Sequence, residues 1–161
     1  MTCNHDNPEP TGWGRDRLTQ YFDDYRRNQY ATFANKRSEV IDLINIDRMF
    51  CSLLDGAVNP RPFIPMDFLL RAHSAFRAAT GAVMAGQVYE AMALLRLCLE
   101  QGAYALYIRD DQKRWEVWMN RHDGDAAKKA VRKDFTHGKI LNHIRRENAN
   151  LGRVYEDLYD S

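Results

Sequence analysis

Two long apolar segments joined by a very short connection constrain the fold more than any other feature of this sequence. Residues 65–84 and 87–109 both repeat apolar residues at the i, i+3, i+4 spacing of an amphipathic helix. Pro65 suits the first position of a helix, and Gly86 suits the residue just past a helix end. Two helices of about 20 residues with so short a connection must pack as antiparallel neighbours. The sequence therefore predicts a central helical hairpin over about 66–109.

The rest of the chain shows helical patterns and no strand or β-hairpin signal. We expect residues 1–14 to be a flexible leader and residues 15–161 to form one all-helical domain. The predicted fold class is all-α, a bundle or array of five to seven helices around the hairpin. The other predicted helices begin near Asp16 and run through Phe33, continue or restart at Ser38 and run through Leu54, and then cover 113–121, 125–135, 139–148 and 150–160.

Composition excludes several classes of protein. The 161 residues carry 23 Lys+Arg and 22 Asp+Glu, so a net charge of +1 indicates no general attraction to nucleic acid or membrane. The longest charge-free run, 78–89, is shorter than the roughly 20 residues of a membrane span. No paired-cysteine motif, secretory leader or nucleotide-binding loop occurs, so we expect a cytoplasmic protein without membrane contact, and we predict no cofactor.

The second hairpin helix is apolar on all sides. Between residues 88 and 108 only Glu90, Arg96 and Glu100 carry a charge. A helix that is apolar all round is usually central and packed by neighbours on every side. We therefore expect this helix to be enclosed on every side, with Arg96 and Glu100 sharing one face and sheltered from water.

Charges sheltered in this way need partners, because an unpaired buried charge costs several kcal/mol. The preceding helix offers His73 and Arg77, so we predict one polar cluster of His73, Arg77, Glu90, Arg96 and Glu100. The cluster is either a structural network or a ligand-binding pocket in which Arg96 anchors a small anion. A metal at His73 with Glu90 or Glu100 has no supporting motif, and no metal site is predicted.

The segment from Gly86 to Glu100, GQVYEAMALLRLCLE, resembles a motif of uncharacterised all-helical bacterial proteins. In that family a helix ends at Gly and the next helix has the pattern E-A-x-x-L-x-R-x-x-x-E. The segment 152–158 is similar to the closing helix of the same proteins. The resemblance covers roughly 66–160 and implies the helical fold and a site at Arg96 and Glu100, but no activity. The last helical pattern reaches Ser161 without a stop signal, which leaves open a continuation of the native chain.

A second, more distant resemblance is to HEPN domains, many of which are ribonucleases or parts of toxin–antitoxin and defence systems. Their signature is an Arg and a His separated by four to six residues on one helix, and Arg132 and His137 have this spacing. The resemblance implies a metal-independent ribonuclease with Arg132 and His137 as its catalytic pair.

The stretch 121–146 is locally basic, with eight Lys/Arg against three Asp. Such a stretch can hold RNA phosphates by electrostatics, and Trp115 and Trp118 just before it can act either as stacking faces or as packing residues. RNA is therefore one candidate partner.

The aromatic residues of the first helical segment suggest a different partner. They are Tyr21, Phe22, Tyr25, Tyr30 and Phe33. An aromatic face too large for a monomer marks an interface, so we expect a homodimer.

No motif dictates a reaction, and the sequence does not decide whether the protein is an enzyme. The leading hypothesis is a helical interaction or accessory module in a defence or toxin–antitoxin setting. The alternatives are the HEPN-like ribonuclease and a bundle that binds a small anionic ligand.

Overall fold

A computed structural model describes residues 9–58, 63–109 and 111–160, and these residues form eight α-helices and no strand. The all-α prediction is confirmed, with one helix more than the expected upper number. The helices are α1 (Arg17–Asn35), α2 (Arg37–Asp55), α3 (Ile64–Met84), α4 (Val88–Arg109), α5 (Gln112–Met119), α6 (Asp125–Asp134), α7 (His137–Glu147) and α8 (Ala149–Asp160).

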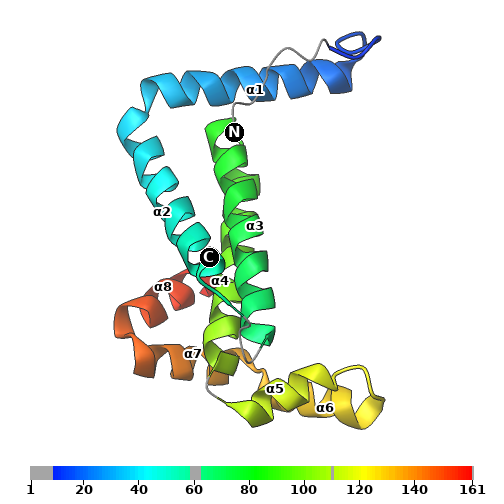
Figure 1. The fold of residues 1–161 in the computed structure, drawn as a ribbon, viewed down its shortest axis with the longest axis vertical. Coiled ribbons are helices and arrows are strands. Elements are labelled where there is room, and N and C mark those ends of the chain that lie inside the picture. Colours follow the sequence, from blue (N-terminus) through cyan, green and yellow to red (C-terminus); the bar gives the residue numbers. More distant parts are fainter. Residues whose placement is uncertain (1–8, 59–62, 110, 161) are drawn as a thin grey trace.

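The predicted hairpin is the centre of the fold, and α3 and α4 lie side by side along the long axis of the molecule (Figure 1). Gly86 closes α3 with a φ of +86°, a conformation that residues with a side chain rarely adopt. The amide of Gln87 then donates to the carbonyl of Ala82 at 2.9 Å. This local chemistry turns the chain back within three residues, as the sequence predicts.

The main core lies where α7 and α8 pack against the C-terminal half of α4. Ile108, Ile140 and Ile144 are almost fully buried there. An aromatic group joins them, in which the ring centroid of Trp118 lies 5.1 Å from that of Phe68. The short helices α5 to α8 therefore cover only one end of the hairpin (Figure 1).

The first two helices form an arm at the other end. Helix α1 lies across the C-terminal end of α3, where Gln29 donates to the Gly81 carbonyl at 2.9 Å and Thr32 to the Met84 carbonyl at 2.7 Å. The Met84 carbonyl is one of those that the end of a helix leaves without a backbone partner, whereas the Gly81 carbonyl also accepts from the Ala85 amide. After a break at Lys36, α2 slants back to pack on α3 (Figure 1). We call α1 and α2 together the arm.

The expectation that α4 is enclosed on every side is wrong for its N-terminal half. Val88, Tyr89 and Met92 are exposed there, and Leu97 is 42 % exposed. The reason is the direction of the arm, because α2 packs on α3 and leaves this side of α4 open, while α5, α7 and α8 reach only the other half. Helix α4 is therefore apolar on all sides, but the rest of the chain buries only part of its surface.

Residues 1–8 of the predicted leader lie outside the described residues. Residues 9–14 form a turn that folds against α1, where the Trp13 indole donates to Asp23 Oδ1 at 2.9 Å and stacks on Phe22. Across the described residues, no helix combines the length and the apolar character that crossing a membrane requires.

Candidate functional site

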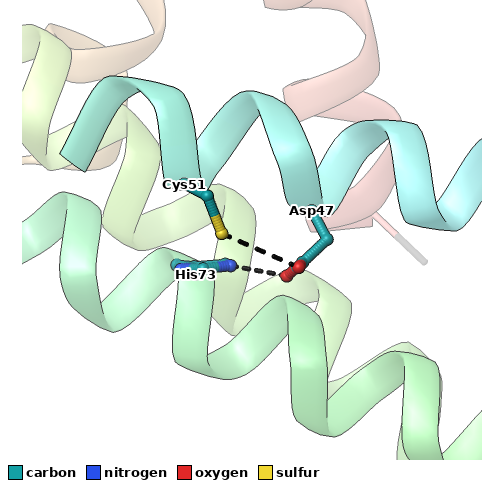
Figure 2. A group of neighbouring side chains, drawn as sticks. All are labelled: Asp47, Cys51 and His73. Atoms are coloured by element: carbon teal, nitrogen blue, oxygen red, sulfur yellow. Dashed lines mark hydrogen bonds and ion pairs between the residues drawn. The ribbon is translucent and has the colours of Figure 1, made fainter. Parts of the chain in front are cut away.

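A polar cluster joins α2 to α3. Asp47 and Cys51 lie one turn apart on α2, and His73 and Arg77 lie one turn apart on α3, so both pairs face the seam between the two helices. His73 Nε2 lies 2.6 Å from Asp47 Oδ1, Arg77 Nε lies 2.7 Å from the same oxygen, and Arg77 Nη2 lies 3.0 Å from Asp47 Oδ2. Figure 2 shows the side chains of Asp47, Cys51 and His73 pointing toward one another. We call these four residues the α2–α3 cluster.

His73 is the buried member of the cluster. It is only 6 % exposed, and its ring stacks on Phe50 with a centroid separation of 4.9 Å and an interplanar angle of 10°. An ionised carboxylate can only accept hydrogen bonds, so His73 Nε2 carries the hydrogen and donates the hydrogen bond to Asp47. Phe50 fixes the plane of the imidazole, and Asp47 fixes which nitrogen holds the hydrogen.

The charge of Asp47 is strongly stabilised. The hydrogen bonds from the Arg77 guanidinium, and next the one from His73, hold the pKa of the Asp47 carboxyl well below its usual range. The same carboxylate raises the pKa of Arg77. Asp47 is therefore a full negative charge at neutral pH, placed at the edge of an otherwise apolar helix seam.

Cys51 completes the cluster with a sulfur atom. Its Sγ lies 3.8 Å from Asp47 Oδ2 and 3.4 Å from Arg77 Nη2, and the side chain is partly buried. One nitrogen, one sulfur and one carboxylate oxygen, from His73, Cys51 and Asp47, all lie within 4.8 Å of one another. This combination of donor atoms is one that a transition metal accepts.

The structure brings together only part of the predicted five-residue cluster. His73 and Arg77 meet, as expected, but their shared partner is Asp47 on α2. Arg96 and Glu100 pair along α4, with Arg96 Nε 3.4 Å from Glu100 Oε1, and their side chains are 42 % and 29 % exposed. Glu90 is exposed in the first turn of α4.

Arg96 and Glu100 are both partly exposed, and the hydrogen bonds of His73 and Arg77 described above go to α2 rather than to α4. The expectation was wrong because α2, not α4, faces the polar side of α3.

Sequence reasoning did not single out Asp47 or Cys51 as candidate site residues. A signal was present, because the side of α2 that faces α3 carries Val40, Leu43 and Phe50, and Asp47 interrupts this apolar stripe. A carboxylate inside an apolar helix stripe needs a partner, and the basic residues of the next helix were the obvious choice.

Arg132 and His137 lie on different helices. Arg132 is exposed near the end of α6, whereas His137 begins α7 and its ring stacks on Tyr155 at 5.4 Å. The single shared helix that the HEPN resemblance implies is absent, because the chain leaves the α-helical conformation at Phe135 and Thr136. Thr136 caps α7 through its hydroxyl, which accepts from the Lys139 amide.

The basic stretch 121–146 contributes to a cleft of about 460 Å³ between the end of α4 and helices α5, α6 and α7. Four cationic residues line it, together with Asp111 and Asp134. Trp118 packs in the aromatic core, so it does not present a free stacking face. The cationic lining residues are Lys113, Arg114, Lys139 and Arg146.

A scan of protein-family models, a search of curated proteins and a search of solved structures each find no match to the chain.

Proposed function

We propose that this protein is a helical interaction module that self-associates as a homodimer through its arm. The observation that carries the proposal is a second apolar stripe on α2. The inner side of this helix packs on α3, while Ile46, Met49 and Leu53 form a separate ridge at the i, i+3, i+7 spacing. All three are exposed, and Met49 is 66 % exposed. We call these three residues the α2 ridge.

A helix with two apolar stripes needs two partners, and α3 covers only one of them. The neighbouring helix α1 has no buried residue among those described, although it carries several large apolar side chains. Five of these are exposed, namely Leu18, Tyr21, Phe22, Tyr30 and Phe33. Both helices of the arm therefore carry exposed large apolar side chains, and exposed apolar surface of this kind marks protein interfaces.

The total exposed area supports a second copy as the occupant. A compact monomer of 18.8 kDa exposes about 8,300 Å² on the size scaling of folded proteins, whereas this chain exposes 11640 Å². Large homodimer interfaces bury about 2,000–5,000 Å² in total, half of it from each chain. The excess of about 3,300 Å² is thus large enough to supply one subunit's share of such an interface.

Sedimentation velocity across the micromolar range tests the proposal. We expect the wild-type protein to sediment with a mass of twice 18.8 kDa. Met49→Asp places a carboxylate in the middle of the α2 ridge and should shift the protein to one chain. Asn45→Asp is the matched control, because it adds the same charge to an exposed polar position of α2 and should leave the dimer intact. A wild-type protein that stays a single chain, or a dimer that Met49→Asp leaves unchanged, would refute the proposal.

The basic cleft favours RNA as a second candidate partner. Its four cations line one cleft and can attract phosphates, although Arg114 and Lys139 already have carboxylate partners in Asp111 and Asp134. Binding of a labelled single-stranded RNA should weaken steeply with salt, and Lys113→Gln with Arg146→Gln should reduce the slope. Lys128→Gln, on α6 and outside the cleft lining, is the control. Binding that does not depend on salt would remove this candidate.

The ribonuclease hypothesis is tested separately, by an RNA-cleavage assay. An RNA-cleaving protein of this kind should act in the presence of EDTA, and His137→Ala should abolish the cleavage. Cleavage that persists in this variant would exclude His137 from the mechanism. The separation of Arg132 and His137 onto two helices gives this hypothesis less support than self-association has.

A further inference from the structure

We infer that Asp47, Cys51 and His73 form a binding site for a zinc-type transition-metal ion, and that Arg77 occupies the place of the metal when none is bound. This inference is independent of self-association, because the α2 ridge lies on a different side of α2. The three ligand atoms are His73 Nε2, Cys51 Sγ and one carboxylate oxygen of Asp47, and they already lie within 4.8 Å of one another (Figure 2).

The distances fit a tetrahedral ion after small movements. Zinc binds sulfur at about 2.3 Å and nitrogen or oxygen at about 2.0–2.2 Å, which places neighbouring ligand atoms about 3.3–3.6 Å apart. Cys51 Sγ lies 3.8 Å from Asp47 Oδ2, whereas His73 contacts the other oxygen, Oδ1, so the carboxylate must rotate to offer one oxygen to the ion. His73 Nε2 and Asp47 Oδ1 are hydrogen-bonded at 2.6 Å and must separate by about 1 Å or less to admit the ion.

The donor set selects the class of ion. Thiolate and imidazole favour zinc and the later first-row ions over magnesium and calcium, which prefer oxygen ligands. Three protein ligands leave a fourth position for water, as in zinc sites that stay open. The side chain of Asp47 is 31 % exposed and that of Arg77 is 58 % exposed, so solvent reaches this side of the cluster.

The charges also balance. Asp47 as a carboxylate and Cys51 as a thiolate together match a divalent cation. On binding, the thiol proton leaves to solvent, and the imidazole proton moves from Nε2 to Nδ1 by exchange with water. The ring stacking of Phe50 on His73 holds the imidazole in the orientation that ligation requires.

Arg77 is the competitor in this site. Its guanidinium contacts both Asp47 oxygens and Cys51 Sγ, which are the atoms that an ion would take. Its exposed side chain can move into solvent when the metal enters. If the cluster were only a structural ion-pair network, Arg77 would not compete with a metal ion. The effect of removing Arg77 on metal affinity therefore distinguishes the two roles.

Cobalt(II) titration of the full-length protein tests the inference. We expect one ion per chain, with tetrahedral d–d bands and a thiolate-to-cobalt charge-transfer band in the near ultraviolet. Cys51→Ser should abolish the charge-transfer band. Cys98→Ser should keep it, and so should Cys3→Ser combined with His5→Gln, which removes the donors near the N-terminus. Persistence of the band in Cys51→Ser, or its absence from the wild-type protein, would overturn the assignment.

Competition with a coloured zinc chelator measures the role of Arg77. Because its charge opposes the ion, Arg77→Gln should tighten zinc binding, whereas Arg71→Gln, another exposed arginine of α3, should leave affinity unchanged. Cys51→Ser should weaken binding by about tenfold or more, since even residues that only support metal ligands contribute that much. Arg77→Gln is a surface change that preserves folding, so an unchanged or weaker affinity in this variant would refute the competition.

Discussion

Asp47 is the residue whose removal should show how the arm is held to the hairpin. In Asp47→Ala, His73 loses the acceptor for Nε2, and this nitrogen belongs to a residue that is 6 % exposed. A buried donor left without a partner costs about 1–3 kcal/mol. The Arg77 contribution is small by comparison, because its guanidinium is largely solvated and water replaces the carboxylate. We therefore expect the free energy of unfolding to fall by about 1–3 kcal/mol, mostly through His73.

Urea unfolding at pH 7 measures this loss, with Asp42→Ala as the control. Asp42 is an exposed aspartate on the same helix, so its replacement tests the effect of removing a charge from α2 without touching the α2–α3 cluster. Equal free energies of unfolding for the two variants would refute the reasoning, because they would show that the cluster contributes nothing to folding.

The dependence on pH follows from the lowered pKa of Asp47. In the unfolded chain the carboxyl takes up a proton near its ordinary pKa of about 3.9, whereas the folded protein keeps it ionised to lower pH. Acid therefore favours the unfolded chain. The stability difference between the wild-type protein and Asp47→Ala should be complete above about pH 5 and should shrink as the pH falls further. A difference that grows in acid would contradict the assigned direction of the shift.

Three glycine substitutions give further expected outcomes. Gly152→Ala should destabilise the packing of α8 on α7 by about 1–3 kcal/mol, because the new Cβ would contact Arg145 Cγ and lie 3.1 Å from its Cα; thermal unfolding measures this. Gly102→Ala, with nothing within 4 Å, should instead raise the melting temperature, since alanine favours a helix interior by about 0.5–1 kcal/mol. Gly86→Ala should cost about 1–2 kcal/mol in the same assay through its positive φ alone, and an unchanged melting temperature would show that the turn relaxes.

The parts of the fold that the sequence predicts are those set by local chemistry. The predicted hairpin agrees with α3 and α4 because Pro65 and Gly86 limit the two helices directly. The short helices after residue 110 also match their predicted ranges closely, since Asp111 and Thr136 act as N-terminal caps. No glycine or proline marks the break at Lys36, so the sequence leaves open whether one helix continues through this residue.

The candidate site shows where such reasoning fails. His73 and Arg77 were chosen correctly as residues that need partners, but they were assigned to Arg96 and Glu100 because the hairpin was the only secure pair of neighbours. Their real partner, Asp47, precedes them along the chain by 26 and 30 residues and is separated from them by the proline-containing connection. The packing of α2 on α3 brings Asp47 to these residues, and no local pattern of the sequence encodes that packing.

The apolar character of α4, which predicted an enclosed helix, is shared by exposed surfaces of the arm. Large apolar side chains are exposed on the outer side of α2 and on α1 as well as on the N-terminal half of α4. We therefore propose that α2 has a separate role on each of two sides. Its inner side joins the arm to α3 through Asp47, and its α2 ridge is available to a second copy. In the proposed dimer, the bonds from Asp47 to His73 and Arg77 would hold α2 on α3 and so help to position the ridge.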